Sequence, residues 1–385
     1  MNMKIAHTSD LHIDSEHPER WDALKLVLEK AKGDEVDYLV IAGDLFDDVA
    51  SANENIAKLR SYFSGLPFKT IVIPGNHDFL AFETERDLGD NVVVLSKNNP
   101  IHSDPSNRIS FFTVPYLDGA TNEYFYEKLA YISKNVDPSW FNIFVFHGDL
   151  DEVLKKIKHR KEIAGAEEET AFSLSLKVLQ KFPSVQLILS GHYHTFGEPI
   201  SIGDSSRLIV YSGAPVSITR NDLGTRYLLI YDVDPNTKKV VLNKYPLETF
   251  YFEKLEIYLT PTSGESIENY VLSRIESSLS TSQRKTIILE LKGYISSKEQ
   301  GMSELNLKEA VKRYCEEKWT GRVVFSENWF GVLDVGFLLD KPFSQSILEQ
   351  IDGLNDNDVS EEDKRTLKQW FLSALSQVYS PKGKI

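Results

Sequence analysis

Over the first 250 residues, short apolar segments alternate with longer amphipathic ones. Polar or turn-forming residues follow each apolar segment, as is typical of buried β-strands. The amphipathic segments have the spacing of helices that bury one face. Strands and helices that alternate with short connections predict a layered α/β domain. The predicted strands are Lys4–Thr8, Tyr38–Ala42, Thr70–Ile73, Arg108–Val114, Ile143–Phe146, Gln186–Leu189, Arg207–Tyr211 and Arg226–Tyr231, and the predicted helices are Glu19–Lys32, Asn53–Phe63, Glu123–Lys134 and Phe172–Lys181.

The pattern changes near Pro246–Phe252, where we place a domain boundary. Strand, helix, strand, helix and strand follow in turn, which predicts a small α+β domain. We expect a domain over residues 1–250, a smaller α+β domain over residues 251–342 and a C-terminal helical segment over residues 343–385. The elements expected in the second domain are strands at Leu255–Leu259, Thr286–Gly293 and Arg322–Ser326 and helices at Ile267–Leu279 and Leu307–Trp319.

The last predicted helix follows a polar loop that contains Asn355–Asp358. Ser360 and Asp363 have the spacing of an N-cap residue and its acidic partner in the first turn. Two interpretations of the helix stay open, because its apolar face could pack on its own domain or dock on a partner protein. That face consists of Leu367, Trp370, Phe371, Ala374 and Val378.

The composition is that of a globular protein, with 41% hydrophobic and 26% charged residues, which argues against a disordered chain. A net charge of −14 argues against coating nucleic acid by bulk charge, although a local basic groove stays possible. Cys315 is the single cysteine, so no intrachain disulfide can form, and this fits a reducing compartment. No segment has the pattern of a signal peptide or a membrane span. We expect a cytoplasmic protein without a membrane contact.

Five polar motifs follow predicted strands within one to three residues. Because ligands of open α/β sheets gather at the carboxyl ends of strands, we expect these motifs to form one pocket. The motifs are Ser9-Asp10-Leu11-His12, Gly43-Asp44, Gly75-Asn76-His77-Asp78, His147-Gly148 and Gly191-His192-Tyr193-His194.

Imidazole and carboxylate groups together favour Mn, Fe, Zn or Co over Ca and Mg. A shared carboxylate, for which Asp44 is the candidate, could bridge two such ions. The glycines before Asp44, Asn76 and His192 would let the backbone turn sharply beneath the ions. Taken alone, each motif could be a turn or a hydrogen-bonded structural histidine. Five turns that all present ligand residues after strands are hard to explain in that way, so we predict a dinuclear metal site.

This series of motifs resembles the calcineurin-like metallophosphoesterase superfamily. Within that superfamily, five sequence segments resemble the SbcD-type DNA double-strand-break-repair nucleases. The segments are HTSDLHID, AGDLFDD, IPGNHD, GHYH and YSGAPVS (Tyr211–Ser217). The resemblance spans residues 7–217 and implies a layered β-sandwich flanked by helices. By position and element order, the smaller second domain resembles that family's capping domain, which contacts DNA.

The resemblance implies that Asp10, His12 and His194 hold one divalent ion. It implies that Asn76, His147 and His192 hold the other, and that Asp44 bridges the two. His77 would be the catalytic histidine that binds no metal, with Asp78 orienting its ring. Some members carry histidine where this chain has Asp47, so a histidine role in strand handling does not transfer.

Several other polar residues have a structural and a functional interpretation. His7 lies within a predicted strand, where a core or supporting role is favoured over a ligand role. Cys315 is expected to be a structural thiol. The densest basic cluster could be a solvated helix face or could contact a phosphate backbone. The candidate DNA contacts there are Lys155, Lys156, Lys158 and Arg160, and Arg220 and Arg226 are similar candidates.

The favoured function is a dinuclear-metal-dependent DNA nuclease, an exonuclease on duplex ends and an endonuclease on single strands. The resemblance implies Mn²⁺ as the metal, a homodimer, and work in double-strand-break repair with an SbcC-type, SMC-like ATPase. Two alternatives stay open. The first is a phosphodiesterase or phosphatase of the same superfamily that acts on a nucleotide or phosphoprotein. The second is a non-catalytic scaffold, against which the complete ligand set and His77 argue.

Overall fold

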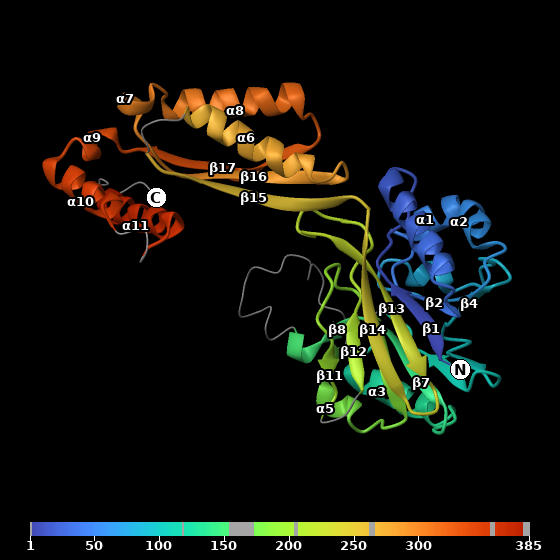
Figure 1. The fold of residues 1–385 in the computed structure, drawn as a ribbon. Coiled ribbons are helices and arrows are strands. Elements are labelled where there is room, and N and C mark those ends of the chain that lie inside the picture. Colours follow the sequence, from blue (N-terminus) through green and yellow to red (C-terminus); the bar gives the residue numbers. More distant parts are fainter. Residues whose placement is uncertain are drawn as a thin grey trace. The chain divides into compact units, whose positions relative to one another are not determined.

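The computed structural model describes residues 2–117, 119–153, 173–203, 207–261, 266–354 and 359–379. The chain divides into two compact units, Met1–Tyr251 and Phe252–Ile385. Figure 1 labels many of the elements of each unit. None of the described helices has the length and apolar character needed to cross a membrane.

Two six-stranded sheets form the centre of the first unit. In the first sheet, β1, β2, β3 and β4 run parallel, and β13 pairs antiparallel with β1. In order across it, the strands are β14 (Lys239–Leu247), β13 (Arg226–Asp234), β1 (Met3–Thr8), β2 (Tyr38–Ala42), β3 (Lys69–Ile73) and β4 (Val92–Val94).

In the second sheet, β6, β7, β10 and β12 run parallel. His147 at the end of β7 lies opposite Gly191 at the end of β10, so the loops that follow these two strands start side by side. In order across it, the strands are β11 (Ile200–Ser201), β12 (Leu208–Tyr211), β10 (Val185–Gly191), β7 (Phe141–His147), β6 (Ile109–Phe112) and β5 (Ile101–Asp104). A separate two-stranded sheet joins β8 (Asp149–Leu150) and β9 (Ser173–Leu174).

The apolar residues of the two sheets and of the helices that flank them form three cores. These cores separate four layers, in the order helices, sheet, sheet and helices. Because side chains alternate along a strand, Val40 of β2 faces the second sheet together with Ile143 and Leu187, whereas Leu39 faces the helices. Helices α1 (Pro18–Gly33) and α2 (Val49–Phe63) cover the first sheet. Helices α3 (Asn122–Ser133) and α5 (Leu176–Leu179) cover the second. The predicted layered β-sandwich flanked by helices is confirmed.

The second unit has a three-stranded sheet with the order β15 (Tyr251–Leu259), β16 (Lys285–Ile295) and β17 (Val323–Asp334). Helices α6 (Ile267–Ser280) and α8 (Glu304–Lys318) pack on one face of this sheet and enclose an apolar core that includes Cys315 (Figure 1). The remaining helices are α7 (Ser297–Gln300), α9 (Gly336–Leu339), α10 (Pro342–Asp352) and α11 (Glu361–Tyr379).

The prediction of which face of the last helix is buried is wrong in part. Leu372 and Leu375 of α11 are buried in a small core of the second unit. Trp370 is 68% exposed, and Ala374 is exposed as well. Tertiary packing therefore selects a face next to the one that the apolar pattern indicated. The expected cap is present, because Ser360 Oγ accepts a hydrogen bond from the Asp363 N–H at 3.1 Å.

Some predicted boundaries also differ. The helix expected over Phe172–Lys181 is shorter, since Ser173–Leu174 is a strand and α5 covers only Leu176–Leu179. Strand β14 was not predicted, because its partly exposed edge position gives it no continuous apolar run. The side chain of Val378, the polar loop Asn355–Asp358 and the basic cluster at residues 155–160 lie outside the described part of the chain.

Replacing Leu187 by alanine should lower the free energy of unfolding by about 2–5 kcal/mol, because its side chain is fully buried between the two sheets. Urea denaturation followed by circular dichroism measures this loss. Val241→Ala is the control, since Val241 is 45% exposed and should change stability by no more than about 0.5 kcal/mol. Equal losses in the two variants would contradict the layered packing.

Candidate metal centre

The predicted ligand residues leave neighbouring strand ends of both sheets. The turns after β1 and β2 carry Asp10, His12 and Asp44, and the turn after β3 carries Asn76. In the second sheet, β7 ends at His147, and the turn after β10 carries His192 and His194.

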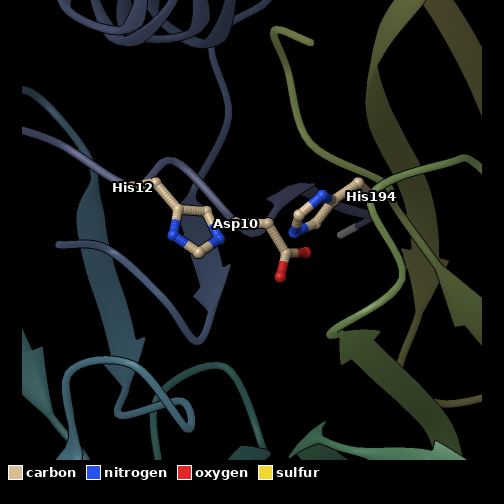
Figure 2. A group of neighbouring side chains, drawn as sticks. All are labelled: Asp10, His12 and His194. Carbon is tan, nitrogen blue, oxygen red and sulfur yellow. The ribbon is translucent and has the colours of Figure 1, made fainter. Parts of the chain in front are cut away.

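The first cluster contains Asp10, His12 and His194. One possible ligand atom from each residue lies within 4.8 Å of the others. Figure 2 shows the two imidazole rings on either side of the Asp10 carboxylate, and the ring centroids are 5.2 Å apart. All three side chains are largely withdrawn from solvent. The structure thus brings together the first predicted ligand set.

The second cluster contains Asn76, His147 and His192. The Asn76 Oδ1 atom lies 3.0 Å from His147 Nε2 and 3.2 Å from His192 Nδ1. The other nitrogen of His147, Nδ1, donates a hydrogen bond of 2.8 Å to the Ala42 carbonyl. That bond directs Nε2 inward, where it can act as a metal ligand.

Asp44 lies between the two clusters. Its Oδ2 atom is 3.1 Å from His147 Nε2 and 3.7 Å from His12 Nε2. Its Oδ1 atom accepts a hydrogen bond of 2.9 Å from the backbone N–H of His77. A carboxylate that faces a histidine of each cluster is in the position required of the predicted bridge.

Backbone geometry holds the ligands close together. Asp10, His12, Asp44 and His192 all have positive φ angles, a conformation that costs a non-glycine residue roughly 1–3 kcal/mol. A Cβ atom at Gly75 would lie 2.1 Å from Asp44 Oδ1, so only glycine permits this approach. Such strain is common where a site is built in advance of its ligand.

Burial and charge act strongly on the Asp44–His147 pair. Burial lowers the pKa of His147, but the facing Asp44 carboxylate outweighs it and raises the pKa to about 10. Burial raises the pKa of Asp44, and the attraction of His147 then lowers it well below the usual range. A bound cation would replace the proton on His147, so metal binding should release protons.

The donor set fits divalent transition metals. The Nε2 atom of His12 is buried and makes no hydrogen bond within the described part of the chain. Buried polar atoms are otherwise almost always hydrogen-bonded. Together with the other imidazoles, the carboxylates of Asp10 and Asp44 and the Asn76 amide oxygen, it forms the nitrogen and oxygen set that Mn, Fe, Zn or Co prefer.

His77 differs from the other histidines because its side chain is exposed. Its ring lies edge-on to that of His12, with centroids 4.7 Å apart. The Nδ1 atom lies 3.2 Å from the Asp47 carbonyl, which can only accept, so Nδ1 carries the hydrogen. The other ring nitrogen, Nε2, then remains available to contact the substrate. One ring nitrogen is also within 4.8 Å of the His12 and Asp44 ligand atoms, so metal measurements must test its non-ligand role.

The structure corrects the role expected of Asp78. Its buried carboxylate accepts hydrogen bonds from the backbone N–H groups of Gly75 at 2.8 Å, Leu45 at 2.9 Å and Phe46 at 3.2 Å. The His77 ring is held instead by Asp47. Asp78 therefore ties the loop after β3 to the loop after β2 and does not orient the ring of its neighbour.

Carboxylates that the motif pattern did not indicate support the ligands. Asp222 is buried, and its Oδ2 atom lies 3.1 Å from His194 Nδ1. Burial lowers the pKa of His194, but the hydrogen bond to Asp222 raises it overall. The Oδ1 atom of Asp149 lies 3.4 Å from His192 Nε2, and the Oδ1 atom of Asp47 lies 3.2 Å from His12 Nδ1. Each metal-facing histidine outside the Asp44–His147 pair thus has a carboxylate behind it, which is a usual arrangement in metal sites.

The two arginines named as candidate DNA contacts lie in different environments. Arg220 is exposed at the surface. Arg226 is buried, and its guanidinium donates to the carbonyls of Gly224, His194 and Leu223, so it has a structural role. His7 is also buried, 3.2 Å from the Tyr231 hydroxyl, which fits the core role favoured for it.

Replacing Asp222 by asparagine should weaken metal affinity about 10- to 100-fold, because the His194 ring loses its charged partner. Isothermal titration of the metal-free protein with Mn²⁺ measures the affinity. Asp234→Asn is the matched control, since that carboxylate caps the turn before β14 through Asn236 and Thr237. Identical affinities in both variants and the wild type would show that Asp222 does not support a metal ligand.

The chain resembles solved structures only distantly. It is 14% identical to a protein of Thermus thermophilus, covering 63% of this chain and 99% of that one with a TM-score of 0.38. A dimetal phosphatase from Danio rerio is 11% identical, with 63% and 95% covered and a TM-score of 0.42. A purple acid phosphatase from yellow lupin (Lupinus luteus) seeds is 13% identical, with 64% and 52% covered and a TM-score of 0.41.

The sequence profile of one family matches the part of the chain that carries the ligands. The match covers residues 3–196, half of the chain, and includes every residue of the two clusters and Asp44. The four-layer fold, the strand-end loops and the clustered histidines and carboxylates agree with it. The chain therefore belongs to the calcineurin-like phosphoesterase family.

Proposed function

We propose that this phosphoesterase is a DNA nuclease of the SbcD type, which cuts duplex ends as an exonuclease and single strands as an endonuclease. The observation that carries the proposal is the place of the motif Tyr211–Ser217. Ser212 lies 2.8 Å from the Ser9 hydroxyl, which in turn donates to the Asp10 carboxylate. The Ala214 N–H donates to the His194 carbonyl at 2.9 Å. The motif typical of the nuclease branch thus supports Asp10 through Ser9 and His194 through its backbone.

The residues of the site suit hydrolysis of a phosphodiester. Two divalent ions, for which we propose Mn²⁺, would offset the phosphate charge and lower the pKa of an attacking water. Asp10, His12 and His194 would hold one ion. Asn76, His147 and His192 would hold the other, and Asp44 would bridge them. All of these groups except Asn76 and His194, which are partly exposed, are buried, and burial strengthens their electrostatic effect.

His77 is the group placed to act on the substrate itself. Its Nδ1–H is fixed by the Asp47 carbonyl, and the ring stands exposed beside the buried His12. Through Nε2 it can stabilise charge on phosphorus or protonate the leaving oxygen, as a general acid does near neutral pH.

Two further features support DNA and a protein partner as ligands. The second unit, residues 252–385, has its own sheet and core, and a small-molecule phosphatase does not require such a unit. Helix α11 leaves Trp370 exposed beside its buried face, which suits docking on an SbcC-type ATPase in double-strand-break repair. A homodimer is part of the same proposal.

Replacing His77 by alanine should reduce cleavage about 100- to 10,000-fold without loss of bound metal, because His77 is the proposed acid rather than a ligand. Asp44→Ala should remove metal from both sites. Inductively coupled plasma mass spectrometry of the two purified variants measures metal content. Loss of metal from the His77 variant would show that His77 is a ligand, and normal metal content in the Asp44 variant would refute the bridge.

The substrate class is tested by parallel digestions with Mn²⁺. We expect cleavage of end-labelled duplex and single-stranded DNA, and bis-p-nitrophenyl phosphate should report the metal chemistry independently. The Asp44→Ala variant controls for a contaminating nuclease. Hydrolysis of bis-p-nitrophenyl phosphate or a cyclic nucleotide without any cleavage of DNA would overturn the nuclease proposal in favour of a small-molecule phosphodiesterase.

A further inference from the structure

A cavity of the first unit is lined by residues other than the metal ligands. It has a volume of about 300 Å³ and lies between the loop after β6 and one face of α3. Among the described residues, three tyrosine rings and two lysines contribute to its wall. The residues are Tyr116, Tyr124, Tyr131, Lys97 and Lys128, and we call the cavity the tyrosine–lysine pocket.

The strand order places this pocket beside the metal centre. Strand β6 pairs in parallel with β7, so the loop after β6 leaves the same sheet edge as His147. Neighbouring strands are about 4.8 Å apart. The Tyr116 ring also packs against Phe79, with centroids 5.1 Å apart, and Phe79 is two residues beyond His77. The pocket therefore adjoins the loop that presents the exposed catalytic histidine.

The chemistry of the wall matches a nucleotide. Aromatic rings can stack on any nucleobase, and lysines attract the phosphate group next to that base in the strand. Tyr131 is 69% exposed, and Lys128 stands 5.3 Å from the Tyr124 ring centroid. The side chains of Lys97 and Lys128 are both exposed, so their charges are accessible to a ligand. A volume of about 300 Å³ is at the lower end of the range for small-ligand sites.

We propose that the tyrosine–lysine pocket binds one nucleotide of single-stranded DNA, with the base on the tyrosines and the phosphate on the lysines. This inference rests on the proposed nuclease function. The pocket would hold a strand beside the metal centre while His77 acts on a neighbouring phosphodiester. A protein surface is a poorer match, since the two lysines among the described lining residues favour a polyanion.

Binding of a fluorescein-labelled oligothymidylate in EDTA, followed by anisotropy, tests the pocket without cleavage. Tyr131→Ala should weaken binding about 5- to 100-fold because a stacking surface is lost, whereas Tyr131→Phe should bind as the wild type does. Lys128→Gln should weaken binding and reduce the slope of log affinity against log salt by about 0.7. Lys32→Gln, at an exposed position of α1, is the charge control and should leave the slope unchanged.

The outcomes separate the pocket from the nuclease proposal. If the wild type cuts DNA and Tyr131→Ala and Lys128→Gln bind the oligonucleotide normally, the pocket inference is wrong while the nuclease function stands. If the wild type neither binds nor cuts DNA but hydrolyses bis-p-nitrophenyl phosphate, both fail. A Tyr131→Ala variant that changes molar mass in light scattering, with unaltered oligonucleotide binding, would assign the surface to a second copy of the chain and overturn the inference.

Discussion

The pairing of Asp44 with His147 is the interaction on which the site depends. Asp44 follows a strand of the first sheet, and His147 ends a strand of the second, so the pair joins the two sheets at their shared edge. Both side chains are almost completely buried. A buried carboxylate needs a nearby positive charge, which the protonated imidazole or a bound cation can provide. The same requirement explains why the other ligands converge on this point.

Groups outside the predicted ligand set support the convergence. Asp78 joins the loops after β2 and β3 through three backbone N–H groups. Asp222, Asp149 and Asp47 stand behind His194, His192 and His12. Because the His194 ring is hydrogen-bonded to Asp222, its other nitrogen has one direction available, and the entropy of ordering this ligand is lost during folding rather than during metal binding.

The tyrosine–lysine pocket depends on the same layered arrangement. The loop after β6 lies one strand away from His147, and α3 covers the face of the sheet from which that loop leaves. A site for chemistry and a site for positioning substrate can therefore share one sheet edge. This is the usual place for ligands in α/β proteins, because loops there tolerate variation while the sheet keeps its geometry.

The sequence by itself determined the strands that deliver the ligands, the ligand residues that the structure brings together and the layered class of fold. It could do so because apolar runs, glycines and histidines at strand ends are local signals. Tertiary structure alone decided that Asp78 ties loops together, that Asp222 supports His194 and that Arg226 is buried. These roles depend on contacts between residues far apart in the chain. Packing likewise chose the buried face of α11, since Leu372 and Leu375 meet a core that the helix's own pattern does not specify.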